Sequence, residues 1–256
     1  MKLADISISV ELKKINLHLA TPSYMPWTMK SEFVDFMKNP FRYISTPVEK
    51  QQVLNDISMK AKSGDRIGIL GRNGAGKTSL CRVISGQLKP SQGQMTVKGQ
   101  VTAIFDTAIG IYPDLTGREN AELVLKYLLP KNSDTHKRVI ADAGEFSELK
   151  SWLDRPFRMY SAGMKTRLSL SLITAIPSEI LILDEVFEGA DEGFRKKIQL
   201  RLNSFIDRSS IFIFVSHSRQ QILNVCNRAI LVNQGRLLFD GSPQEAFQIY
   251  DSVLGL

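Results

Sequence analysis

The sequence predicts an α/β fold, in which strands and helices alternate along one chain. Short apolar runs bounded by turn residues are typical of buried strands, and segments with helical spacing separate them. A glycine-rich segment also joins one of these strands directly to a helix. The 256 residues are enough for one large domain with a well-buried core.

The expected strands are four apolar runs and a hairpin. They are "RIGIL" (66–70), "EILILD" (179–184), "SIFIFVS" (210–216) and "RAILV" (228–232), followed by a hairpin in "NQGRLLFDG" (233–241). The segment "TSLCRVISGQL" (78–88) is expected to be a helix. A second helix should begin at Ser161, because serine is a preferred N-cap, and stop before Pro177.

The composition is typical of soluble globular proteins, with 43% apolar and 23% charged residues. No apolar run is long enough to span a bilayer, and the N-terminus lacks the apolar region of a secretory signal. Cys81 and Cys226 have no metal-ligand spacing, which favours core thiols in a reducing cytosol. The net charge of +7 is dispersed and accompanies no nucleic-acid-binding motif, so no nucleic acid is expected as a partner. A position beside acidic lipids stays open.

The segment "GRNGAGKT" (71–78) predicts a phosphate-binding loop, because it fits G-x-x-x-x-G-K-S/T between a strand and a helix. Its glycines allow backbone conformations that aim N–H groups at phosphates. Lys77 is expected to reach the β- and γ-phosphates, and the Thr78 hydroxyl to ligate Mg²⁺. The predicted binding residues of this loop are Asn73, Gly74, Ala75, Gly76, Lys77 and Thr78.

Two further motifs follow expected strands. Asp184 and Glu185 stand at the carboxyl end of an apolar run, where α/β folds bind ligands. Asp184 would hold Mg²⁺, and Glu185, which points the other way, suits a general base that polarises water. An acidic pair that merely ends a strand is the alternative. His217 ends another strand, and we interpret it as a γ-phosphate contact rather than a structural histidine.

These motifs and "MYSAGM" (159–164) occur in the order found in ATP-binding-cassette (ABC) ATPases, which the chain resembles over about residues 50–245. The resemblance implies a single domain over 1–256, a P-loop (RecA-like) NTPase core with an antiparallel β subdomain. A helical subdomain at about 106–160 would carry the signature motif at its end. The cofactors would be ATP and Mg²⁺, and the reaction hydrolysis of ATP.

The same resemblance gives a role to the turn at Ser161. This turn stands where the family has its LSGGQ-type signature, which caps the nucleotide of a second subunit packed head to tail. Ser161 and Gly163 would then hold the γ-phosphate of the ATP of a second copy of this chain. Asp191 would lie in the D-loop that touches the opposite subunit. A plain helix cap at Ser161 is the alternative.

Three segments resemble the ATPases that export bacterial surface polysaccharides such as O-antigen, capsule or teichoic acid. They are "YSAGM", "DLTGREN" (114–120) and "DEVFEGAD" (184–191). The resemblance implies a peripheral motor subunit at the cytoplasmic face of the inner membrane, bound to a polytopic permease. The alternative is a soluble non-transport ABC ATPase of the translation or DNA-repair type. A small-molecule kinase would have no use for the signature motif.

The chain also departs from the family. Where ABC ATPases carry a glutamine near the metal or attacking water, Asp106 aligns best. The candidates for stacking on adenine are His18, Tyr24 and Tyr43. Some members append a C-terminal carbohydrate-binding domain, whereas this sequence stops soon after the last expected helix. Either the system does not use that module or it lies beyond this end.

Residues 20–50 form an insert with four prolines around "SEFVDFMK" (31–38). Phe33, Phe36 and Met37 stand at helical spacing, which predicts a short amphipathic helix. This helix either covers the core or packs at the membrane-facing entrance of the partner. Trp27, Phe33 and Tyr43 suit such an interface because aromatic rings collect where apolar and polar surroundings meet.

Overall fold

The computed structural model describes residues 7–21, 49–105, 112–129, 133–184, 192–216 and 218–254. Its strands are β1 (Ser9–Thr21), β2 (Glu49–Lys62), β3 (Arg66–Leu70), β4 (Gln92–Lys98), β5 (Val101–Ile104), β6 (Ile180–Asp184), β7 (Ile211–Val215), β8 (Arg228–Asn233) and β9 (Arg236–Gly241). Its helices are α2 (Lys77–Ile84), α3 (Gly117–Leu128), α4 (Ser133–Ser147), α5 (Ala162–Ala175), α6 (Glu192–Arg208), α7 (Arg219–Val225) and α8 (Pro243–Leu254), with 3₁₀ turns η2 (Lys150–Asp154) and η3 (Phe157–Met159).

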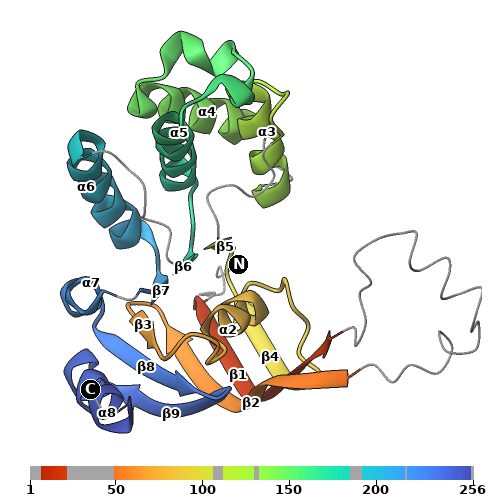
Figure 1. Ribbon diagram of the computed structural model, residues 1–256, viewed down its shortest axis with the longest axis vertical. Coiled ribbons are helices and arrows are strands. Elements are labelled where there is room, and N and C mark those ends of the chain that lie inside the picture. The colour runs from red at the N-terminus through yellow and green to blue at the C-terminus, as the bar shows by residue number, and fades with distance from the viewer. Residues whose placement is uncertain are drawn as a thin grey trace, which may run out of the picture.

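The strands form two sheets, which confirms the α/β prediction. The larger sheet has the order β5-β6-β7-β3-β8-β9, in which the first five strands run parallel and β9 pairs antiparallel with β8. The smaller sheet is antiparallel, in the order β2-β1-β4. Helix α2 packs between them, because its apolar residues share one core cluster with both sheets. Figure 1 shows α3, α4 and α5 grouped at one end of the molecule.

The apolar runs become strands of the larger sheet because both of its faces are covered. In β7, Ile211, Ile213 and Val215 face the cluster that contains α2. Phe212 and Phe214 face the opposite cluster, which contains α5, α6 and α8. Successive side chains of a strand point to opposite faces, so a strand buried on both faces must be apolar throughout.

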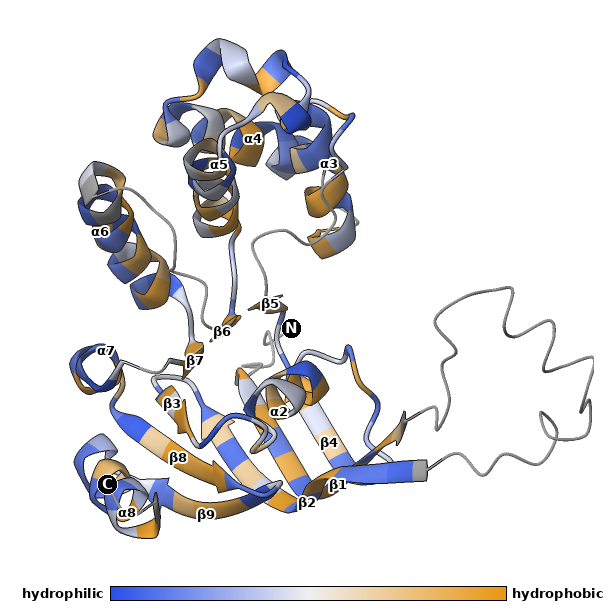
Figure 2. Ribbon diagram, viewed as in Figure 1, coloured by the Kyte–Doolittle hydropathy of each residue, from blue (hydrophilic) through white to orange (hydrophobic). Residues whose placement is uncertain are grey.

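The two long strands β1 and β2 were not identified from the sequence alone, because bulges interrupt the alternation of apolar and polar residues along them. Figure 2 shows this banding. In β1, Val10 and Leu12 are buried. Ile15 and Leu17 are also buried, although regular alternation from Leu12 would bury positions 14 and 16 instead. A register irregularity lies between Leu12 and Ile15, and Lys14 takes a φ of 50° there. This bulge returns the apolar side chains to the inner face.

Helix α5 connects two cores. Leu170 and Ile173 belong to the cluster beneath α6, while Leu172 and Ile176 belong to the cluster formed by α3 and α4. All residues from Leu168 to Thr174 are buried. A helix that is buried all round is an interior element, so α5 joins the helical group to the larger sheet.

The prediction of a helix over 78–88 was wrong at its end, because α2 stops at Ile84. Ser85 follows as the C-cap, and Gly86 takes a left-handed φ of 77°. The Gly86 N–H donates to the Val83 carbonyl at 2.9 Å. A glycine in this conformation ends helices because it has no Cβ to clash.

The hairpin at 233–241 is confirmed, with β8 and β9 joined by a turn at Gln234 and Gly235. The helix expected from Ser161 to before Pro177 is confirmed as α5. The predicted insert helix (31–38) lies outside the described residues. Within the described ranges, no helix is both long enough and apolar enough to cross a membrane.

Candidate nucleotide site

The predicted phosphate loop joins β3 to α2 and is wedged between other backbone segments. Gly71 has a φ of 149°, and a Cβ there would overlap the Val232 carbonyl of β8. Gly235 in the β8–β9 turn donates its N–H to the Ala75 carbonyl at 2.9 Å. Neighbouring backbone segments therefore hold the loop in place.

The N-terminus of α2 differs from those of three other helices. Helices α3, α5 and α7 have a side-chain cap from Thr116, Ser161 and Ser218. Helix α2 has Gly76 as its N-cap, with a φ of 104° and no side-chain cap hydrogen bond. A helix start has N–H groups without intrahelical partners and a positive dipole end. This start therefore fits an anion such as a phosphate.

Lys77 makes hydrogen bonds that bear on this fit. The Lys77 ammonium donates to the carbonyls of Gly71 at 2.9 Å and Arg72 at 3.1 Å, so it lies over the loop. Asn73 and Gly74 are exposed, and a Cβ on Gly74 would meet nothing within 4 Å. Ala75 and Gly76 are buried. The loop thus presents its tip outward and its cation inward.

Strand β6 brings Asp184 to the loop. The Thr78 hydroxyl donates to the Asp184 carboxylate at 2.6 Å, although the two residues lie 106 positions apart. Asp184 is only 6% exposed. A hydroxyl and a carboxylate are both hard oxygen ligands, and Mg²⁺ is usually held by one or two carboxylates together with substrate phosphates. The pair therefore fits a magnesium ion beside the phosphate loop.

The charges of this pair affect a buried thiol. Cys81 lies one helical turn after Lys77 and is fully buried. Burial, with the Asp184 charge as a smaller cause, holds the pKa of the thiol well above its usual range, and the Lys77 charge opposes this shift. Cys81 is therefore a protonated core residue, as the sequence predicted, and so is the free thiol of Cys226.

The predicted signature turn lies on another element. Ser161 caps α5 by accepting a hydrogen bond from the Met164 N–H at 3.2 Å. Ser161 is exposed, and a Cβ on Gly163 would meet nothing closer than the Ser161 hydroxyl at 4.0 Å. In Figure 1 the chain passes from the other end of α5 into β6. The signature end is thus separated from β6 by a helix about 21 Å long, at about 1.5 Å per residue.

The segment "DLTGREN" packs against the residue that precedes the signature turn. Thr116 and Glu119 form a reciprocal capping box at the start of α3, and the Thr116 hydrogen bonds lower the pKa of Glu119. Gly117 packs so closely on Tyr160 that a Cβ would overlap its hydroxyl. That hydroxyl donates to the Trp152 carbonyl at 2.6 Å. Only the capping box was readable from sequence; the contact with Tyr160, which directly precedes Ser161, was not.

Several predicted residues lie outside the described residues: Asp106, Glu185, Asp191 and His217, together with Tyr24 and Tyr43. Of the predicted site, the structure therefore brings Lys77, Thr78 and Asp184 together at the loop. His18 lies on β1 opposite Gln52, and its backbone N–H donates to the Ser91 hydroxyl.

Known ATP-binding proteins are similar to this chain over most of its length. The family model of the ABC transporter matches residues 54–188. The O-antigen export system ATP-binding protein RfbB of Klebsiella pneumoniae is 33% identical, over 80% of this chain and 83% of the relative. RfbE of Yersinia enterocolitica, which has the same description, is 38% identical over 74% and 78%. The teichoic acids export ATP-binding protein TagH of Listeria monocytogenes is 31% identical over 86% and 65%.

A solved structure has the same fold. It is an ATP-binding cassette described as a dimer in a post-hydrolysis state, bound to ADP and Pi. It matches with a TM-score of 0.66 and 18% identity, over 91% of this chain and 98% of that one. The family model covers more than half of this chain, and the relatives above cover most of it. The chain therefore belongs to the ABC transporter family and has the fold of its ATP-binding cassette.

Proposed function

We propose that this chain is the ATP-hydrolysing motor subunit of an exporter that moves a lipid-linked surface polysaccharide across the bacterial inner membrane. The observation that carries the ATPase part is the Thr78–Asp184 hydrogen bond, which joins the phosphate loop to the end of β6. The relatives named for O-antigen and teichoic acid export support the polysaccharide part.

We assign the binding roles as follows. The loop from Asn73 to Thr78 and the uncapped start of α2 would bind the phosphates of ATP, with Lys77 supplying a positive charge. Thr78 and Asp184 would hold Mg²⁺, and we assign Asp106 to the same metal site from the family resemblance. When bound, this ion neutralises charge on the β- and γ-phosphates. Glu185 would act as the general base, and His217 would contact the γ-phosphate.

The second copy of the chain completes the proposed site. The exposed start of α5 is remote from β6, so Ser161 and Gly163 suit a nucleotide held by a partner. Asp191 would touch the opposite subunit at the same interface. The structural neighbour described as a dimer supports this arrangement. One phosphate loop and one signature turn per chain then give two composite sites per homodimer.

The proposed membrane contacts of this chain involve a permease and the insert. We place the chain at the cytoplasmic face, peripheral to the bilayer and bound to a polytopic permease. The insert (about 20–50) and the helical subdomain (about 106–160) belong to the single domain over 1–256. The exposed Tyr112, Leu123 and Tyr127, on and beside α3, offer apolar contacts for a partner.

Two substitutions test the ATPase assignment. Lys77→Ala removes the cation at the loop and should weaken ATP binding. Glu185→Gln should retain binding but slow hydrolysis by about 10² to 10⁴, as expected when a general base is lost. Nucleotide binding and phosphate release are measured on the same preparations with Mg²⁺ present. Near-normal turnover in Glu185→Gln would exclude Glu185 from the chemical step.

A further inference from the structure

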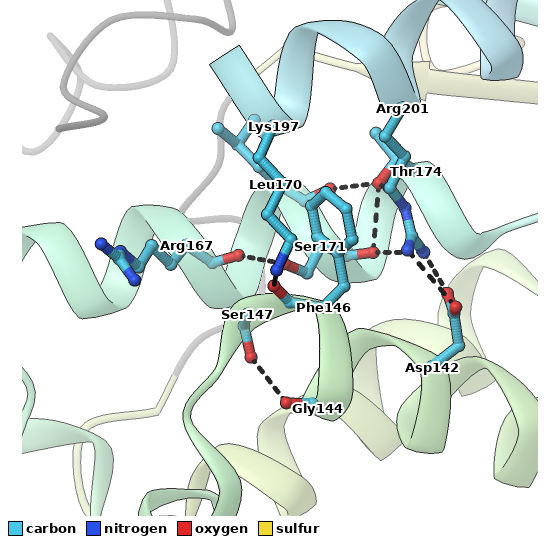
Figure 3. Close-up of polar contacts among 10 residues, drawn as sticks. All are labelled: Asp142, Gly144, Phe146, Ser147, Arg167, Leu170, Ser171, Thr174, Lys197 and Arg201. Atoms are coloured by element: carbon cyan, nitrogen blue, oxygen red, sulfur yellow. Dashed lines mark hydrogen bonds and ion pairs between the residues drawn. The ribbon is translucent and has the colours of Figure 1, made fainter. Parts of the chain in front are cut away.

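Phe146, near the end of α4, lies between two cations of α6. The Arg201 guanidinium carbon is 4.2 Å from the centre of the ring, and the Lys197 ammonium is 4.6 Å from it. Figure 3 shows both side chains reaching from α6 toward α4. A cation within about 6 Å of an aromatic ring is attracted by its quadrupole. We call Phe146, Lys197 and Arg201 the cation clamp.

Both cations are also anchored by hydrogen bonds, which fixes their positions over the ring. Lys197 donates to the Phe146 carbonyl at 2.9 Å and to the Glu148 carboxylate at 2.7 Å. Arg201 forms an ion pair with Asp142 on α4 and donates to the Thr174 hydroxyl on α5 at 2.8 Å. The Arg201 side chain is only 15% exposed, so solvent screens its contacts with Phe146 and Thr174 weakly.

A hollow beside the clamp shows how α4 and α6 are joined. A cavity of about 720 Å³ opens between these helices, and its lining includes the clamp residues, Asp142 and the exposed Leu200. On this side, charged side chains bridge the gap between the two helices. The Phe146 ring also lies edge-on to Phe194 of α6, with the ring centres 5.7 Å apart. Around this one aromatic contact, a few directional contacts take the place of continuous apolar packing, which resists movement.

The clamp is connected to the helix that carries the signature turn. Glu148, which accepts from Lys197, also forms an ion pair with Arg167 of α5 at 3.4 Å. The Arg167 guanidinium lies 5.1 Å from the centre of the Phe194 ring on α6. Arg167 stands four positions after Gly163 and Phe194 three positions after Asp191. The start of α5 and the start of α6 are thus held together through one polar cluster.

We infer that the cation clamp positions the signature end of α5 relative to β6 and the phosphate loop. Without the Phe146 ring, the helical group would remain folded but could tilt, because the two cations of α6 would lose the aromatic face that fixes them against α4. The clamp residues are positioning residues, since they do not touch the nucleotide themselves. This inference rests on the proposed function, in which Ser161 and Gly163 reach the nucleotide of a second copy.

A matched pair of substitutions at Phe146 tests the clamp. Phe146→Leu keeps an apolar side chain but removes the ring, whereas Phe146→Trp keeps a ring and has room to expand into the cavity. In a Glu185→Gln background, ATP-driven dimerisation is followed by size-exclusion chromatography with light scattering. Phe146→Leu should raise the ATP concentration at the midpoint about threefold to tenfold, and Phe146→Trp should restore it. ATP binding by the monomer should not change.

A distance measurement shows whether the helical group tilts. Spin labels are placed at Lys137→Cys on α4 and Lys196→Cys on α6, both exposed, while the buried native thiols stay unlabelled. The distance distribution should broaden in Phe146→Leu and stay narrow in Phe146→Trp.

The outcomes separate the clamp from the proposed function. If the Glu185→Gln parent does not dimerise with ATP, the proposed dimer is wrong and the inferred role of the clamp falls with it. If the parent dimerises and Phe146→Leu has the same midpoint and distances, the clamp alone is overturned. A Phe146→Leu protein that loses thermal stability while its folded fraction dimerises normally would also count against it.

Discussion

Cys226 is a buried thiol whose proton makes stability depend on pH. It packs near Gly68 and Ile222, and burial raises its pKa to about 12. The unfolded chain releases this proton near pH 9, so above that pH the folded state binds one proton more than the unfolded state. The free energy of unfolding should therefore fall as pH rises from about 9 toward 12, and be unaffected by this group below pH 9.

A Cys226→Ala variant measures this contribution. Urea unfolding at pH 8.5, 9.5 and 10.5 should show a slope that is less steep than in the wild type, by about 1.4 kcal/mol per pH unit above pH 9. The pKa of Cys81 is raised as well. Because both proteins retain Cys81, its contribution to the slope is the same in both and cancels in the comparison. Equal slopes in the two proteins would mean that Cys226 ionises in the folded state.

At the scale of an element, a substitution at Gly163, at the start of α5, should impair function without impairing folding. Because a Cβ there meets nothing within normal contact distance, Gly163→Asp should fold. A carboxylate in the first turn of a helix also interacts favourably with the dipole, so the melting temperature should not fall. The same carboxylate would occupy the anion site and repel a γ-phosphate. ATP-driven dimerisation and hydrolysis should be lost, while monomer ATP binding at Lys77 stays nearly unchanged.

Mixing two inactive variants makes this prediction sharper. A Lys77→Ala subunit combined with a Gly163→Asp subunit should regain at most one intact site, built from the phosphate loop of one chain and the signature turn of the other. Phosphate release by the mixture is compared with that of each variant alone. Loss of nucleotide binding by isolated Gly163→Asp would show instead that Ser161 and Gly163 only cap a local helix.

The contact between Gly117 and Tyr160 gives a second prediction for this region. Gly117→Ala would overlap the Tyr160 hydroxyl and should lower the free energy of unfolding by about 1–3 kcal/mol, as overpacking does. Tyr160→Phe removes that hydroxyl along with its bond to Trp152. In urea unfolding, the double variant should therefore lose less stability than the sum of the two single variants. Additive losses would mean that the two residues do not constrain each other.

The elements that the sequence predicted are those with local signals. Strands β3, β6, β7 and β8 are continuous apolar runs, and the phosphate loop is a short contiguous pattern. The antiparallel sheet entered only through the family resemblance, because bulges in β1 and β2 interrupt the alternation that indicates a half-exposed strand. The cation clamp could not be predicted, since Phe146 and Arg201 meet only after three helices have packed. The Thr78–Asp184 pair was predictable because strand ends meet at one edge of a parallel sheet.

At the scale of the whole molecule, we propose that the insert contacts the membrane partner. Replacing Phe33 and Phe36 with Ser should leave ATP hydrolysis by the isolated subunit largely intact and reduce transport or assembly with the permease. Both activities are measured on the same variant, with co-purification from solubilised membranes as the readout for assembly. Unfolding of the soluble subunit would favour the alternative, a helix that covers the core.

The ribbon formed by β1 and β2 has a mechanical consequence. Its last described pair is Thr21 with Glu49, so residues 22–48 are attached at its tip. Asn55 of β2 donates to the Gly235 carbonyl at 2.8 Å, and Gly235 donates to Ala75 of the phosphate loop. At about 3.3 Å per residue, Asn55 lies about 20 Å from the tip. Because the two strands are paired along this whole length, a displacement of the tip is passed along β2 to Asn55, and two backbone hydrogen bonds connect Asn55 to the phosphate loop.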